Sequence, residues 1–211
     1  MVKSGPANYQ KITPVRTAVL CIIAAVLNHT IHPLLVPVLK LPLFVDTVFT
    51  AAVTFYAGLI PGLAAAVLTW IIGFMIKDGI VTPFIICSIA EVLIIFLLKP
   101  SDVNTRIQNE ARKRAVFVSA LGRLMLLYIT VCIVISILGG LIDYIFFTVL
   151  SNTKPDFSAE DAFKEWLFHN TLPVIAMNIL SRLPVNIVDR FIVIFGGYFI
   201  SRAVIKLLNH D

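Results

Sequence analysis

Long apolar runs separated by short polar breaks dominate this chain of 211 residues. A run of about 20 apolar residues can cross the hydrocarbon core of a bilayer as a helix. The runs predict an all-α membrane protein with six transmembrane helices, at residues 15–27, 43–59, 63–76, 80–98, 115–138 and 185–208. A tight break at Pro61 and Gly62 precedes the third run, and the fifth could continue past Gly139 and Gly140 to residue 150.

Two segments between the runs are polar, and both are too short to be domains. Residues 99–114 form a basic connector. Residues 151–170 form an acidic loop, whose SAEDAFKEW stretch predicts a short amphipathic helix with Ser158 as its N-cap. Residues 171–180 are apolar but short, so they form either a re-entrant or interfacial helix, or the outer part of a long bent last span.

The composition is that of a chain surrounded by lipid. Hydrophobic residues make up 59% of it and charged residues only 14%, too few for the surface of a soluble domain of this size. We therefore expect one integral membrane domain over residues 1–211, with a polar tail at 1–14 and a candidate lid at 151–180.

The distribution of basic residues predicts an orientation. The net charge of +5 could suggest a nucleic acid partner, but the basic residues flank the apolar runs, so we expect none. With six spans, only Lys40, Lys77, Lys154 and Lys164 fall clearly on one side, and most other Lys and Arg residues fall on the opposite side. The positive-inside rule then places both termini and the 99–114 connector in the cytoplasm. We expect a multi-pass protein of a bacterial or archaeal cytoplasmic membrane.

Two opposite charges lie at similar depth inside neighbouring spans. Glu91 is about seven residues before the cytoplasmic end of the fourth span, and Arg123 is about nine residues after the start of the fifth. An unpaired charge at that depth is costly. We therefore predict a structural ion pair between Glu91 and Arg123.

Polar groups also collect at the predicted outer ends of four spans. They are Asn28, His29, His32, Asp46, Asp143, Tyr144, Asp189 and Arg190. Such groups can hydrogen-bond a polar ligand, and Phe49 or Tyr56 could stack on its ring. The pattern predicts a pocket open to the outside, with Asn28 and His32 among its ligand-binding residues. In the alternative interpretation Asp46 pairs with Arg190 or Arg182 to hold helices together. The ligand-binding and the helix-holding interpretations can both be true.

No motif indicates catalysis, a cofactor or a metal. Phosphate-binding loops and hydrolase motifs are absent, so we expect no enzyme activity and no nucleotide site. His29 and His32 could share a helix face, but no carboxylate or thiol lies at matching spacing, so we expect no metal. Cys21, Cys87 and Cys132 lie inside apolar runs and are expected to be reduced.

Two motifs suggest a family. The run PLFVDTVFTAAVTFYAGLIPG resembles the "PLFLDT…G…G" signature of substrate-binding S components of energy-coupling-factor (ECF) vitamin transporters and of related membrane sensor regions. The last span, beginning SRLPVNIVDRF, is similar to the R-x-P-V-N-x-x-D-[KR] ending of the same group. The resemblance covers roughly a third of the chain.

The resemblance implies a six-helix fold with both termini inside and a pocket near the outer face for a vitamin or similar solute. The positions that match its motifs are Asp46, Thr47, Asn186, Asp189 and Arg190.

In this family a face of small residues on the first helix docks the coupling subunit. Thr17, Cys21 and Ala25 occupy the corresponding face, with Thr and Cys as departures from Ala. Small residues at this spacing let helices approach closely, so the face serves either internal packing or docking of another subunit.

These observations lead to an expected function. The chain would be a solute-binding membrane subunit for uptake of a vitamin or similar small molecule, energised by a separate transmembrane coupling subunit and an ATPase pair. The alternative is a sensory module that binds a small ligand and signals through a partner. A signalling version would carry an output domain, and the end of this chain at Asp211, soon after the last run, favours uptake.

Overall fold

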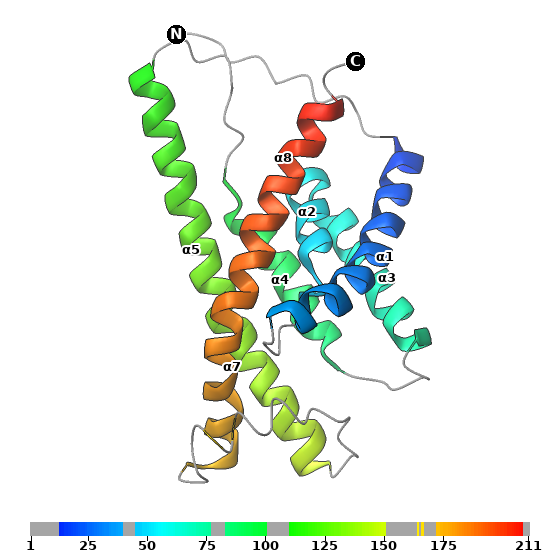
Figure 1. Cartoon of the computed structure of the whole chain (residues 1–211), viewed down its shortest axis with the longest axis vertical. Coiled ribbons are helices and arrows are strands. Elements are labelled where there is room, and N and C mark those ends of the chain that lie inside the picture. Colours follow the sequence, from blue (N-terminus) through cyan, green and yellow to red (C-terminus); the bar gives the residue numbers. More distant parts are fainter. Residues whose placement is uncertain are drawn as a thin grey trace.

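The computed structural model describes residues 13–39, 45–76, 83–100, 110–150, 164, 166 and 172–208. All regular elements in these ranges are helices, as predicted (Figure 1). In chain order they are α1 (Pro14–Leu39), α2 (Val48–Ala57), α3 (Leu59–Ile76), α4 (Ile85–Leu98), α5 (Glu110–Ile142), the π-helical η1 (Asp143–Val149), α7 (Val174–Phe191), the π-helical η2 (Ile192–Gly196) and α8 (Gly197–Leu208).

Within the described ranges, four helical stretches are long and apolar enough to cross a membrane. They are Pro14–Ile31, Leu59–Ile76, Arg114–Phe146 and Val174–Leu207. The apolar helices α2 and α4 are shorter. The all-helical fold is therefore confirmed, with helices that suit a membrane protein, and the count of six full spans stays a prediction.

The last membrane-spanning stretch is longer than predicted. Helix α7 begins at Val174 and passes through η2 into α8 without a gap, so the helical path runs to Leu208. Pro184 lies inside α7, where it removes one backbone donor without ending the helix. Of the two alternatives for residues 171–180, the described part thus forms the beginning of the last long helix.

The break between the second and third helices is at Gly58, not at Pro61 and Gly62. Gly58 has a φ of 92°, a conformation that residues with a side chain rarely adopt. Pro61 instead lies in the first turn of α3, where a helix needs no N–H donor. The prediction placed the break three residues late because proline reads as a breaker in sequence but is tolerated at a helix start.

Several ends of helices gather on one side of the molecule. The start of α1, the start of α5 and the end of α8 lie at the same end of the bundle (Figure 1). Helix α5 already begins at Glu110, inside the predicted connector. Residues 1–12 of the predicted tail and residues 101–109 of the predicted connector lie outside the described residues. Of the 151–170 loop, which includes the predicted amphipathic helix, only Lys164 and Trp166 are described.

The interior is apolar where α2, α4, α5 and η2 meet. Its buried side chains are Val45, Val48, Ala51, Ile95, Leu124, Leu127, Val131, Ile135, Val193 and Ile194. Large apolar side chains also remain exposed on the outside of the bundle, for example Ile22 and Ile23 on α1 and Phe117 and Val118 on α5. An exposed apolar surface of this extent suits a lipid environment.

The small-residue face of α1 is turned inward. Cys21 and Ala25 are fully buried, and the Cys21 thiol donates to the carbonyl oxygen of Pro61 at 3.3 Å. Thr17 is half-buried on the same face. This burial favours the internal-packing alternative for Cys21 and Ala25, and docking of another subunit at this face stays a prediction.

Glycines allow α5 and α7 to approach closely. A Cβ atom at Gly140 would lie 2.7 Å from the backbone nitrogen of Ile179 on α7, whereas a Cβ at Gly122 would meet nothing within 4 Å. Both glycines are in the same helix. They form a matched pair for testing this packing.

We predict that Gly140→Ala lowers the free energy of unfolding by about 1–3 kcal/mol, because a backbone cannot move aside as a flexible side chain can. Gly122→Ala should leave stability unchanged or slightly raised, since alanine is the better helix former. Unfolding in detergent micelles measures both. Equal effects of the two substitutions would contradict the close contact.

Candidate solute-binding pocket

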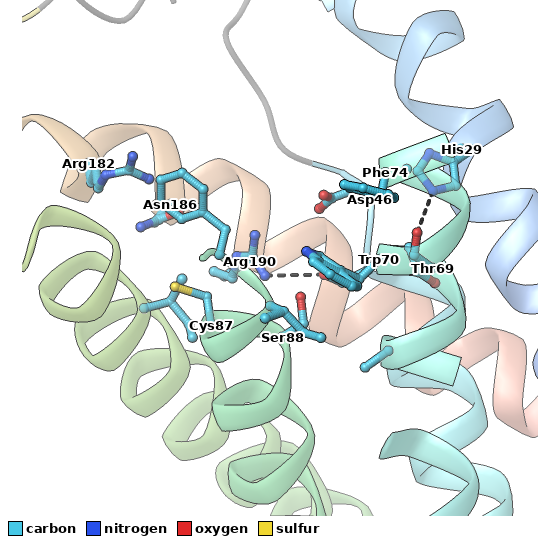
Figure 2. Close-up of a pocket in the computed structure, with 16 residues that line it drawn as sticks. His29, Asp46, Thr69, Trp70, Phe74, Cys87, Ser88, Arg182, Asn186 and Arg190 are labelled. Atoms are coloured by element: carbon cyan, nitrogen blue, oxygen red, sulfur yellow. Dashed lines mark hydrogen bonds between the residues drawn. The ribbon is translucent and has the colours of Figure 1, made fainter. Parts of the chain in front are cut away.

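A pocket of about 170 Å³ lies among α1, α3, α4 and α7, beside the residues that precede α2 (Figure 2). An apolar cavity of about 150 Å³ in a protein can hold one benzene molecule. The pocket therefore has the size of a single ring with a small substituent. Its lining includes His29, Asp46, Thr47, Ala66, Thr69, Trp70, Gly73, Phe74, Phe84, Ile85, Cys87, Ser88, Ile135, Arg182, Asn186 and Arg190.

One wall of the pocket is aromatic. Trp70 and Phe74 are one turn apart on α3, and their rings stack with centroids 5.8 Å apart and an interplanar angle of 20°. At the beginning of α4 Phe84 supplies another ring, 5.0 Å from the guanidinium carbon of Arg182. Aromatic faces of this kind can stack on a flat ligand.

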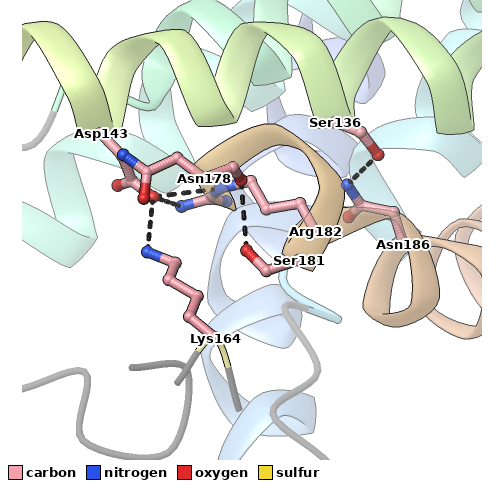
Figure 3. A network of polar contacts seen from close by, with 7 residues as sticks. All are labelled: Ser136, Asp143, Lys164, Asn178, Ser181, Arg182 and Asn186. Atoms are coloured by element: carbon pink, nitrogen blue, oxygen red, sulfur yellow. Dashed lines mark hydrogen bonds and ion pairs between the residues drawn. The ribbon is translucent and has the colours of Figure 1, made fainter. Parts of the chain in front are cut away.

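A second wall is polar and comes from one face of α7. Arg182, Asn186 and Arg190 are spaced four residues apart, which places them in a row on the helix (Figure 2). The predicted Asn186 and Arg190 thus line the pocket. Asn186 donates to the hydroxyl oxygen of Ser136 on α5 at 2.8 Å (Figure 3).

Arg190 is at the centre of a buried charge cluster. Its Nη1 donates to Glu91 on α4 and to the hydroxyl of Thr47 at 3.2 Å, and its Nη2 lies 2.5 Å from the carboxylate of Asp189. The Thr47 hydroxyl in turn faces Glu91 at 3.4 Å. All four residues are buried. We call Glu91, Asp189 and Arg190 the Arg190 cluster.

A second buried cluster is centred on Asp143 and includes Arg182, which lines the pocket. The carboxylate of Asp143 accepts hydrogen bonds from Nη2 of Arg182 at 2.8 Å and from its Nε at 3.2 Å (Figure 3). Lys164, from the segment between α5 and α7, lies 3.5 Å from the same carboxylate. We call Asp143, Lys164 and Arg182 the Asp143 cluster.

Asn28 lies behind the pocket wall instead of lining it. Its amide donates to the hydroxyls of Thr50 at 2.9 Å and Thr69 at 3.1 Å, and its oxygen accepts from the backbone N–H of Phe49 at 3.0 Å. Asn28 is fully buried, so these bonds join α1, α2 and α3. We assign it to the architecture and not to ligand binding.

Of the two histidines that were considered on α1, His29 has a described side chain and His32 does not. A ring nitrogen of His29 lies 2.7 Å from the carbonyl oxygen of Thr69, and His29 lines the pocket. His32 belongs to α1, but its side chain lies outside what is described. Among the described residues no group of three or more His, Cys, Asp or Glu could hold a metal ion.

Asp46 is the predicted site residue whose carboxylate is still available to bind a ligand. It lines the pocket and is partly exposed. Within the described part of the chain it makes no hydrogen bond or ion pair, so the proposed helix-holding pairs with Arg190 or Arg182 do not form. Those two arginines instead contact the carboxylates of the two clusters.

The predicted partner of Glu91 was wrong. Glu91 is paired with Arg190 from α7, while Arg123 is exposed on α5. The depth estimated from sequence could not show that Arg123 faces outward. Asp189 was also predicted to bind ligand, but it is completely buried in the Arg190 cluster and does not line the pocket.

The aromatic wall was missed by the sequence analysis. Phe49 and Tyr56 were suggested as stacking residues, but neither lines the pocket. The available signal was the pair Trp70 and Phe74, four residues apart on an otherwise apolar helix that also carries Thr69.

No protein-family profile, no curated protein and no solved structure matches this chain at a significant level.

We predict that Glu91 and Arg190 are energetically coupled. Arg190→Met should cost roughly 3–5 kcal/mol of unfolding free energy, because it leaves buried carboxylates without a counter-ion. Glu91→Gln should cost less, since Asp189 still pairs with Arg190. The double variant should lose about 1–3 kcal/mol less unfolding free energy than the sum of the two single losses.

The control is a second double-mutant cycle on Glu91 and Arg123, the pair predicted from sequence. Glu91→Gln and Arg123→Met should be additive to within about 0.5 kcal/mol. Additivity for Glu91 with Arg190, or strong coupling for Glu91 with Arg123, would refute the assignment.

Proposed function

We propose that this chain is a membrane-embedded subunit that binds a small organic solute, such as a vitamin or a similar molecule, for uptake into the cell. The observation that carries the proposal is a ring-sized pocket with an aromatic wall and a charged wall inside a bundle of apolar helices. Binding sites for small molecules are typically apolar clefts with a few well-placed polar groups.

The position of the pocket along the helices supports capture from outside. Its lining residues come from the later part of α1, the middle and second half of α3 and the beginning of α4. On the last long helix they lie before the midpoint, far from Leu208. The pocket is thus displaced from the end where α1 starts and α8 ends. If the basic ends are cytoplasmic, the pocket opens to the outside.

The energy for uptake would come from other subunits. The sequence has no phosphate-binding loop, so we expect a transmembrane coupling subunit and an ATPase pair to provide it. This is the arrangement of the ECF transporters whose S components the two motifs resemble. The motif residues Asp46, Thr47, Asn186 and Arg190 all lie at the pocket, which agrees with that resemblance.

A sensory module that binds the same kind of solute is the alternative. It would use the same pocket but signal through its partner instead of passing the solute on. The two functions are distinguished by the proteins that remain bound to the purified chain: an ATPase pair for uptake, or a kinase or other signalling protein for sensing.

Native mass spectrometry of the detergent-purified protein tests solute binding. We expect a small molecule of single-ring size to be retained by the wild-type protein. Trp70→Ala should lower its occupancy by about tenfold, because a stacking surface is lost. Phe117→Ala, which removes an exposed ring of α5 far from the pocket, should leave occupancy unchanged. Absence of any bound molecule, or equal retention by Trp70→Ala, would count against the proposal.

A further inference from the structure

We propose that the solute is a small cation, a single ring that carries one positively charged group, and that Asp46 is its counter-ion. This inference rests on the proposed solute-binding function and narrows it to a chemical class. The charges around the pocket, the aromatic wall and the size of the pocket support it.

The two buried clusters balance each other in charge. The Arg190 cluster holds two carboxylates against one guanidinium, and the Asp143 cluster holds two cations against one carboxylate. Together they carry no formal net charge, with histidine counted as neutral. Arg182 and Arg190, which line the pocket, are therefore already paired with carboxylates. They do not require an anionic ligand.

Among the described residues that line the pocket, Asp46 is the carboxylate that belongs to neither cluster. It lines the pocket and makes no hydrogen bond or ion pair within the described residues. A carboxylate at this depth in an apolar bundle is costly unless water or a cation compensates it. A cationic ligand would supply the missing charge at the place where the carboxylate is.

The aromatic wall favours the same class of ligand. The stacked rings of Trp70 and Phe74 offer a face to a flat ring, and the face of an aromatic ring also attracts a cation. Ser88 and Asn186 add polar groups that can hydrogen-bond a substituent. A protonated amine, an amidinium or an alkylated nitrogen ring on a single cycle meets all of these requirements.

Three single-ring probes of similar size test the charge preference: benzylammonium, benzyl alcohol and benzoate. Their affinities for the purified full-length protein are measured by calorimetry in detergent. We expect benzylammonium to bind about tenfold more tightly than benzyl alcohol, and benzoate to bind most weakly. Asp46→Asn should abolish the preference for the cation while benzyl alcohol keeps its affinity within about twofold. Asp46→Glu, which keeps the charge, should retain the preference.

The outcomes separate this inference from the proposed function. Tightest binding of benzoate, or a cation preference that survives Asp46→Asn, would overturn the charge assignment and leave solute binding intact. Failure of all three probes to bind would overturn the single-ring class. The proposed function is tested separately by native mass spectrometry of the wild-type protein and of Trp70→Ala, so a failure there is distinct from a failure of the charge assignment. Thermal unfolding of each variant without probe verifies that it is folded.

Discussion

The rest of this structure depends on the buried contact between Arg190 and Glu91. Water cannot compensate a charge in the interior of an apolar bundle, so each of these groups needs the other. Arg190 comes from α7 and Glu91 from α4, and Thr47 at the start of α2 bonds to both. One cluster thus fixes the rotation of two helices and the start of a third. Because α7 is held in this rotation, its row of polar residues faces inward, and the pocket forms between that row and α3.

The remaining polar contacts support the same frame. Asn28 joins α1, α2 and α3 through hydroxyl and backbone bonds, and Asp143 joins the end of α5 to α7 through Arg182. Glycines at the contact of α5 with α7 let the backbones approach closely, which brings these polar groups within reach. The pocket is therefore a space left between helices whose positions are fixed by buried polar bonds and small residues. Asp46 is at its edge and takes no part in those bonds.

Much of the fold could be predicted because apolar periodicity and length determine which segments are helices in a membrane. The rotation of each helix about its own axis and the pairing of the buried charges could not be predicted. Glu91 and Arg123 were paired by depth alone, but depth says nothing about which way a side chain points around its helix. Arg190 was recognised as a site residue, and its role in holding Glu91 appeared only in three dimensions. The motif positions Asp46 and Asn186 line the pocket, and their role in binding stays a prediction, whereas the aromatic wall required knowledge of how α3 faces α7.

The proposed function requires that the pocket framed by these buried charges opens on the side of the membrane opposite to the start of α1 and the end of α8. Cysteine accessibility in intact cells tests it most directly. In a variant without Cys21, Cys87 and Cys132, a single Ser88→Cys in the pocket is compared with a single Lys206→Cys near the end of α8, using a membrane-impermeant maleimide. We predict labelling of Ser88→Cys from outside, and labelling of Lys206→Cys only after the cells are permeabilised. The reverse pattern would contradict the account.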